Sequence, residues 1–201
     1  NQLAVMAQTR PGEEVLVDEL AHIRNVERSW GPAHAGIGWR TVATDGGGIL
    51  PSQVDAVMEL AGSLFPRVSL LAWENTHNLS GGRVIPLDVV AETSARARDH
   101  GLRVHIDGAR IFNAEVATGS KAAEFAAAAD TIQFCFSKGL GAPVGSIVCG
   151  STELMEEVRY LRKRLGGGMR QAGVIAAAAR IALRDRERLV EDHHLARYLA
   201  E

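Results

Sequence analysis

Features that would place this chain in several common protein classes are scarce or absent. It has two cysteines in 201 residues, so neither a disulfide framework nor a cysteine-rich metal site organises the fold. No apolar run approaches the ~20 residues of a membrane span, and the start lacks the charged-then-apolar order of a signal peptide. The net charge is -2, with Lys and Arg scattered among acids, so neither a nucleic-acid nor a membrane partner is expected.

The composition that remains is typical of a soluble globular chain with a sizeable core, at 46% hydrophobic and 23% charged residues. Cys135 and Cys149 lie in apolar runs, and we expect both to be small buried hydrophobic residues. Reduced thiols of this kind favour a cytoplasmic setting. The chain opens at Asn1 without a methionine and stops inside a helical pattern at Glu201, so we expect a fragment of a longer protein.

Short apolar runs alternate with amphipathic, alanine-rich segments, which predicts an α/β fold with a mostly parallel sheet in a three-layer α/β/α arrangement. The expected strands cover residues 14–17, 39–43, 68–73, 103–106, 131–136 and 146–149. The expected helices cover residues 53–61, 88–100, 152–165, 171–185 and 187 onward. Ser151 is the expected N-cap of the third of these helices.

Polar side chains gather where four of the expected strands end. They fall in residues 18–22, 74–78, 107–110 and 137–138. A parallel sheet brings the carboxyl ends of its strands to one rim, where ligands collect in open α/β folds. Together these stretches supply an amine, carboxylates, a guanidinium, a hydroxyl and two imidazoles, which is the set of groups that pyridoxal phosphate requires.

Lys138 is the most informative of these residues, because it follows an apolar strand and precedes the glycine-rich stretch 139–143. Partial desolvation at such a position disfavours the ammonium form and makes the amine a usable nucleophile toward carbonyl carbon, as Schiff-base chemistry demands. By position alone, the alternative is an exposed lysine that merely ends a strand.

Four blocks in this order resemble the low-specificity L-threonine aldolases, which are pyridoxal-phosphate enzymes of the aspartate-aminotransferase-like fold. The blocks are residues 74–78 (ENTHN), 105–114 (HIDGARIFNA), 137–146 (SKGLGAPVGS) and 166–171 (GGGMRQ). The resemblance implies that residues 1–185 form a cofactor-binding large domain of the pyridoxal-phosphate transferase type, without its N-terminal part. Residues 186–201 are then the start of a linker helix to a small C-terminal domain that is missing.

The same resemblance implies roles for five residues in holding the cofactor. Lys138 carries it as a Schiff base, Asp107 pairs with its pyridine nitrogen, and His22 stacks over its ring. Arg110 reaches its phenolate oxygen and the substrate carboxylate, for which a planar guanidinium is suited, and Ser137 donates to its phosphate. The alternatives are an Asp107 that caps a turn, an Arg110 in a structural ion pair, and an ordinary helical His22.

Residues nearer the substrate are also implied. His77 lies beside the substrate hydroxyl and takes its proton as the Cα–Cβ bond breaks, unless a water or the cofactor phosphate accepts it and His77 only orients it. Lys163 and Arg170 flank the glycine triplet and approach the cofactor and substrate, either within one subunit or across a subunit interface. The alternative is a flexible link with an incidental arginine. The other histidines show no spacing typical of metal ligands, so no metal is expected.

The implied function is that of a carbon-carbon lyase. It would cleave L-threonine or L-allo-threonine, which are β-hydroxy-α-amino acids, to glycine and acetaldehyde by a retro-aldol reaction. We expect a homodimer or homotetramer with sites shared between subunits. The alternatives are a pyridoxal-phosphate β-eliminating lyase that acts on a related amino acid, and a non-catalytic relative.

Overall fold

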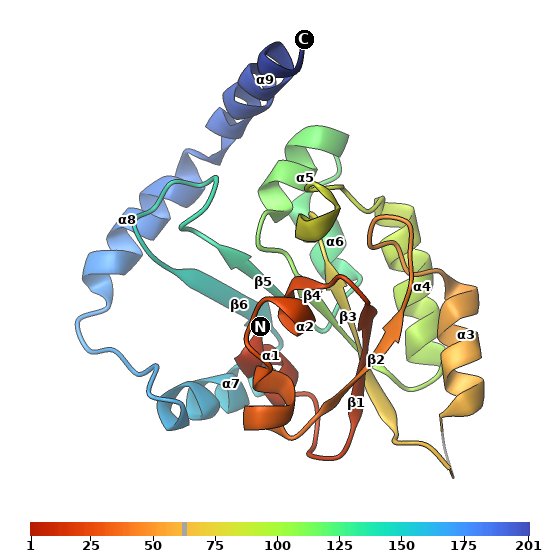
Figure 1. The fold of residues 1–201 in the computed structure, drawn as a ribbon. Helices are drawn as coiled ribbons and strands as arrows, with labels where there is room; N and C mark the ends of the chain where they lie inside the picture. Colours follow the sequence, from red (N-terminus) through yellow and green to blue (C-terminus); the bar gives the residue numbers. More distant parts are fainter. Residues whose placement is uncertain (62–63) are drawn as a thin grey trace.

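The computed structural model describes residues 1–61 and 64–201, and within them the centre of the molecule is a six-stranded sheet of order β2-β1-β3-β4-β5-β6 (Figure 1). The strands are β1 (Glu14–Asp18), β2 (Gly38–Val42), β3 (Val68–Glu74), β4 (Arg103–Asp107), β5 (Thr131–Cys135) and β6 (Ser146–Gly150). Neighbouring strands are parallel except for β6, which runs antiparallel to β5. The predicted mostly parallel sheet is confirmed.

Helices cover both faces of this sheet, which confirms the three-layer prediction (Figure 1). One face carries α3 (Pro51–Leu60), α4 (Leu87–Asp99), α5 (Ile111–Thr118) and α6 (Ala122–Ala127). The other carries α1 (Gln2–Met6), α2 (His22–Asn25), the π-helix η1 (Gly31–Ala35) and α7 (Thr152–Arg164). The 3-10 turn η2 (Asn78–Ser80) follows β3, and α8 (Gly173–Arg184), η3 (Arg186–Arg188) and α9 (Leu189–Ala200) come last.

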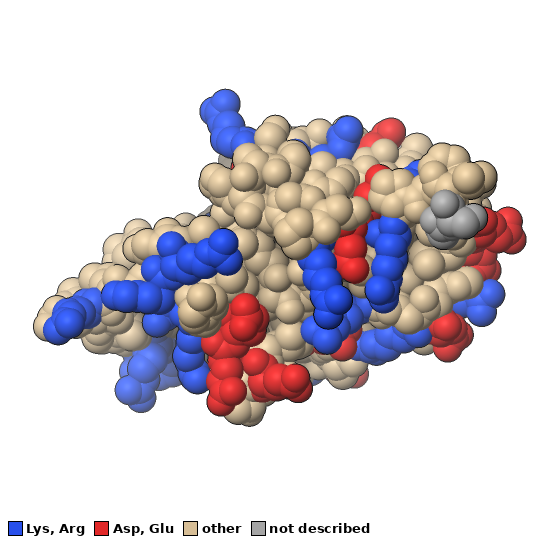
Figure 2. All heavy atoms as spheres, turned by 90° about the horizontal axis from the view of Figure 1, so that it is seen from below, with Lys and Arg blue, Asp and Glu red and all other residues tan. Residues whose placement is uncertain are grey.

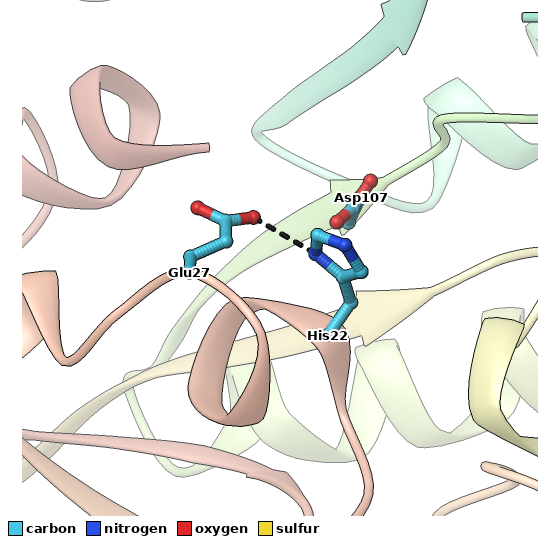
Figure 3. Close-up of side chains that lie close together, drawn as sticks. All are labelled: His22, Glu27 and Asp107. Atoms are coloured by element: carbon cyan, nitrogen blue, oxygen red, sulfur yellow. Dashed lines mark hydrogen bonds and ion pairs between the residues drawn. The ribbon is translucent and has the colours of Figure 1, made fainter.

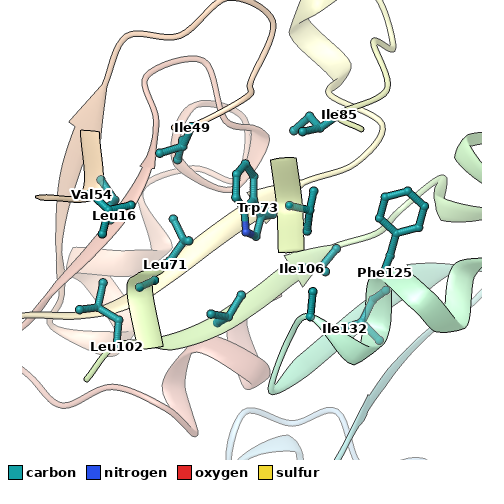
Figure 4. Packing of buried hydrophobic residues seen from close by; sticks show 14 of the residues in the cluster. Leu16, Ile49, Val54, Leu71, Trp73, Ile85, Leu102, Ile106, Phe125 and Ile132 are labelled. Atoms are coloured by element: carbon teal, nitrogen blue, oxygen red, sulfur yellow. The ribbon is translucent and has the colours of Figure 1, made fainter. Parts of the chain in front are cut away.

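The central strand β3 shows why the apolar runs become strands, because all its residues are buried. Successive side chains point to opposite faces of a sheet, so a strand covered on both sides needs an unbroken apolar run. Leu71 and Trp73 pack into the core beneath α3 and α4 (Figure 4). Leu70 and Ala72 pack into the second core beneath α1 and η1.

Local signals set most helix ends as predicted. Pro51 occupies the first position of α3, where its missing N–H costs nothing. Ser151 Oγ accepts a hydrogen bond from Leu154 N at 3.3 Å, which confirms the predicted N-cap of α7. Gly101 follows α4 with φ +79, the left-handed conformation typical of a helix stop. The division at residue 185 into a large domain and a linker stays a prediction, although α9 also packs against α5.

The expectation for the cysteines is wrong. Cys149 is exposed and Cys135 only partly buried, and both are free thiols. The physical reason is the place of β6, which forms the edge of the sheet and leaves most of its residues exposed.

The surface mixes charges of both signs. On the face seen from below, Lys and Arg lie interspersed with Asp and Glu (Figure 2). Among the residues that the structure describes, no helix has both the length and the apolar character needed to cross a membrane.

Candidate active site

The carboxyl ends of β1, β3, β4 and β5 lie next to one another because these strands are parallel neighbours. A cavity of about 300 Å³ opens at this rim, near the lower end of the range usual for small-molecule sites. Its lining includes His22, Asp107, Arg110 and Lys138. The rim therefore brings together one residue or more from each of the four polar stretches that the sequence singled out.

Asp107 forms the buried floor of the cavity, at the last position of β4 and 2% exposed. Its Oδ1 accepts from Gln133 Nε2 and from Ala109 N, and its Oδ2 accepts from Asn1 Nδ2 at 2.8 Å. A carboxylate offers about four acceptor positions, so one position on Oδ2 remains for a ligand donor. A protonated pyridine nitrogen is a donor of the required kind.

His22 lies above this floor, at the start of α2 (Figure 3). His22, Glu27 and Asp107 place ligand-type atoms within 4.8 Å of one another, as a metal site would. However, Asn1 Nδ2 donates to Glu27 Oε1 at 2.7 Å as well as to Asp107, so an amide already joins the two carboxylates. Glu27 Oε1 also lies 3.2 Å from His22 Nδ1. The carboxylates are partnered without a cation, and we assign no metal here.

Glu74, the last residue of β3, accepts hydrogen bonds from the backbone of two segments of the rim. Its buried carboxylate accepts from His22 N at 2.7 Å and from Asn78 N at 2.8 Å. Asn78 Oδ1 in turn accepts from Arg110 Nη1 at 3.1 Å. Burial raises the pKa of Glu74, against the opposing effect of these two backbone donors. The orientation of both His22 and Arg110 thus depends on Glu74, for which no role was predicted beyond its membership of the block 74–78.

His77 lies beside the cavity without lining it. Its ring is 1% exposed, with Nδ1 at 3.0 Å from Ser80 Oγ and Nε2 at 3.1 Å from Asp18 Oδ1. The contact with Asp18 is not aligned as a hydrogen bond, so Nε2 has no aligned partner among the described residues. The role of His77 toward the substrate hydroxyl stays a prediction.

Lys138 and Ser137 are both exposed at the end of the β5 segment. Lys138 lines the cavity, but it is exposed and not partly buried as the sequence predicts. Ser137 Oγ lies outside the cavity and donates to Gly145 O at 3.4 Å. Its role as a phosphate donor stays a prediction.

Lys163 and Arg170 do not join the other predicted residues within this chain. Both are exposed, Lys163 on α7 and Arg170 in the loop after it. Arg159 and Arg162 instead line a groove of about 620 Å³ that shares Asn1 with the cavity. The approach of Lys163 and Arg170 to the cofactor from a second subunit stays a prediction.

Several residues of the site were missed by sequence reasoning, and a signal for some of them exists. Gln133 is the register partner of Asp107, and Thr131 is the register partner of His105. All four are buried polar residues at alternate positions of two apolar strands. Alternate polar residues in neighbouring buried strands share a face, and that pattern marks a polar strip. No comparable signal identifies Asn1 or Glu27, and Glu74 was singled out only as part of the polar stretch 74–78.

Comparisons with known proteins agree with this geometry. The family described as beta-eliminating lyase matches residues 1–201. Low-specificity L-threonine aldolase 1 of Arabidopsis thaliana is 41% identical over 94% of this chain, and the low specificity L-threonine aldolase of Escherichia coli strain K12 is 37% identical over 100% of it. The matched regions cover 54% and 60% of these relatives, so the chain spans little more than half their length.

The fold is also found in solved structures. The structure of Leishmania major threonine aldolase superposes with a TM-score of 0.88 over 100% of this chain and 59% of that protein, at 21% sequence identity. At this identity the likeness concerns the fold, and it agrees with the three layers described above.

Proposed function

Because this chain belongs to the beta-eliminating lyase family, we propose that its rim cavity binds pyridoxal 5'-phosphate and that the whole protein is a threonine aldolase. The substrates are L-threonine and L-allo-threonine, and the products are glycine and acetaldehyde. The observation that carries the proposal is the meeting of Lys138, Asp107, Arg110 and His22 in one cavity. Identity of 37% to 42% with relatives named as threonine aldolases supports it.

The residues of the rim fit this cofactor. When bound, pyridoxal phosphate supplies an aldehyde that condenses with amines and a ring that takes up the electron pair left by carbon-carbon cleavage. Lys138 offers the amine that holds the aldehyde, and Asp107 offers its remaining acceptor position to the ring N–H. His22 forms a wall for the ring, and Ser137 donates to the phosphate once its hydroxyl turns away from Gly145 O.

The substrate is held and deprotonated by the chain's own side chains. Arg110 binds the carboxylate through its planar guanidinium, which Asn78 orients. The proton of the β-hydroxyl passes to His77, or to a water that His77 orients, as the Cα–Cβ bond breaks. Lys163 and Arg170 contribute from a second subunit of a homodimer or homotetramer. The free thiols support a cytoplasmic setting.

A β-eliminating lyase is the second candidate, because the matching family carries that description. It uses the same cofactor and the same Lys138, so the two functions differ in the bond that breaks and in the products released. The geometry of the rim serves both.

Replacement of Lys138 tests the proposal. In the full-length protein we expect Lys138→Ala to lose the visible absorbance of the lysine-bound cofactor. Because the covalent attachment is gone, we also expect the turnover to fall ~10²-fold or more. Lys121→Ala is the matched control, because Lys121 is also exposed but pairs with Glu115 outside the cavity. Unchanged absorbance and turnover in Lys138→Ala would refute the proposal.

A further inference from the structure

Behind Asp107, a chain of hydrogen bonds runs through residues to which the proposed mechanism gives no role. His105 lies two residues before Asp107 on the same face of β4 and is fully buried. Its Nδ1 is 2.9 Å from Thr131 Oγ1, and its Nε2 is 3.2 Å from Asn1 Oδ1. Asn1 then donates to Asp107 Oδ2. His105 is thus connected to the floor of the cavity through one amide.

The directions of these hydrogen bonds follow from the groups at the two ends. Gln8 Nε2 donates to Ala4 O, which can only accept, so the same NH₂ group also donates to Thr131 Oγ1 at 2.7 Å. The hydroxyl proton of Thr131 is then free to point at His105 Nδ1. At the other end, Asn1 Nδ2 faces two carboxylates, so Asn1 Oδ1 faces His105 and accepts.

Of the two neutral forms of His105, only the one with its proton on Nε2 satisfies both neighbours. Burial lowers the pKa of His105 to about 3, so the ring is neutral near pH 7. The donors then all point the same way, from Gln8 through Thr131, His105 and Asn1 to Asp107. In such a series each hydrogen bond polarises the next, and an inverted member would leave a buried group unpaired.

We propose that His105 is a positioning residue, which holds Asn1 and through it Asp107 so that the unfilled acceptor position of Asp107 Oδ2 faces the ring nitrogen of the cofactor. This inference rests on the proposed function and adds to it a specific support for the floor of the site. His105 touches neither cofactor nor substrate; it acts through the amide of Asn1.

The test separates an effect on the ring nitrogen from a general loss of structure. Full-length variants are titrated with pyridoxal phosphate and with its 1-deaza analogue, in which a C–H replaces the ring nitrogen. His105→Asn withdraws the donor from Asn1, whereas His105→Gln places an amide N–H near the position of Nε2. We expect His105→Asn to weaken binding of pyridoxal phosphate roughly tenfold and to leave binding of the analogue unchanged.

Two matched variants sharpen the result. His105→Gln is expected to restore most of the affinity. His100→Gln, which alters a histidine at the end of α4 that pairs with Asp55 of α3, is expected to bind both compounds like the wild type. Should His105→Asn fail to fold, Thr131→Val removes the hydroxyl that fixes the ring, with Thr131→Ser as its control. The same selective loss is expected for Thr131→Val.

Equal weakening of both compounds by His105→Asn would show a merely structural role and overturn the inference, as would no weakening of either. If the wild type binds pyridoxal phosphate and His105→Asn binds it with the same affinity, the inference fails but the proposed function is not affected. Wild-type protein that binds neither compound would refute both.

Discussion

At the scale of single residues, the rim combines the buried carboxylate of Asp107 with the exposed amine of Lys138. Asp107 is buried and receives three N–H donors, whereas Lys138, which lines the same cavity, is exposed. A carboxylate held in this way needs no reorganisation when a cationic ring arrives, which is the advantage of preorganised polar groups. In the proposed function, the exposed amine of Lys138 is accessible to the aldehyde of the cofactor.

His105 makes the stability of the fold depend on pH. Burial lowers its pKa to about 3, below the ordinary value of 6.5. As the pH falls, His105 takes up a proton in the unfolded chain before it does so in the folded one. The contribution of the neutral His105 to the free energy of unfolding is therefore fully present above pH 6.5 and is lost as the pH falls from 6.5 toward 3. Urea unfolding should show that the contribution of His105 to the free energy of unfolding decreases by an amount on the order of 3 kcal/mol between about pH 7 and pH 4.

His105→Gln is the control for this decline, since glutamine does not titrate but can keep a donor toward Asn1. Its free energy of unfolding should fall less steeply over the same range than that of the wild type. His194→Gln, at an exposed position of α9, should keep the full decline. An equal decline in His105→Gln and the wild type would contradict the assignment.

At the scale of elements, the segments that follow the strands build the site, and the loop after β2 shows how closely they pack. Gly47 has φ +93, and an added Cβ would lie 2.6 Å from His77 Cγ. Gly47 N also donates to Thr44 Oγ1, which in turn donates to Asp18. The enclosure of His77 therefore requires a residue without a side chain in a left-handed conformation.

Gly47→Ala should destabilise the protein much more than Gly12→Ala. Gly12 has φ +88 but nothing within 4 Å of an added Cβ, so both variants carry the cost of a left-handed alanine, about 1 kcal/mol, and only Gly47→Ala meets the His77 ring. Thermal unfolding of both variants measures the difference, which we expect to be at least twofold in the free energy lost. Equal losses would show that His77 moves aside freely.

The strands and long helices were predictable from the sequence, because apolar runs and end signals determine them locally. Every strand begins and ends within one residue of its expected bounds. The short helices α1, α5 and α6 were not predicted, since five to eight residues carry too little periodicity. The partners of Asp107 were also missed, because Asn1 lies 106 positions away and only the folded sheet brings it near.

At the scale of the whole molecule, α8 and α9 carry apolar side chains that are largely exposed to solvent. Val174 is 79% exposed and Ile181 54% on α8, and Leu195, Tyr198 and Leu199 are exposed on α9. These helices form the extended blue arm in Figure 1. Exposed apolar groups of this extent indicate that further protein surface packs here. A homo-oligomer of the full-length protein is consistent with this arm.

Mixing two inactive variants tests the sharing of sites between subunits. If Arg170 acts in the partner's cavity, Lys138→Ala and Arg170→Ala subunits recombined in equal amounts should recover about a quarter of wild-type activity, because half the dimers are mixed and each contains one intact site. Sedimentation of the full-length protein establishes the oligomer in the same samples. A monomer, or no recovery on mixing, would contradict shared sites.

The identity of the products distinguishes a threonine aldolase from a β-eliminating lyase. Full-length protein loaded with pyridoxal phosphate is incubated with uniformly ¹³C-labelled L-threonine, and the products are followed by NMR. We predict labelled glycine and acetaldehyde in equal amounts, and neither product from Lys138→Ala. Formation of 2-oxobutanoate and ammonia in place of glycine and acetaldehyde would contradict the aldolase and identify a β-eliminating lyase.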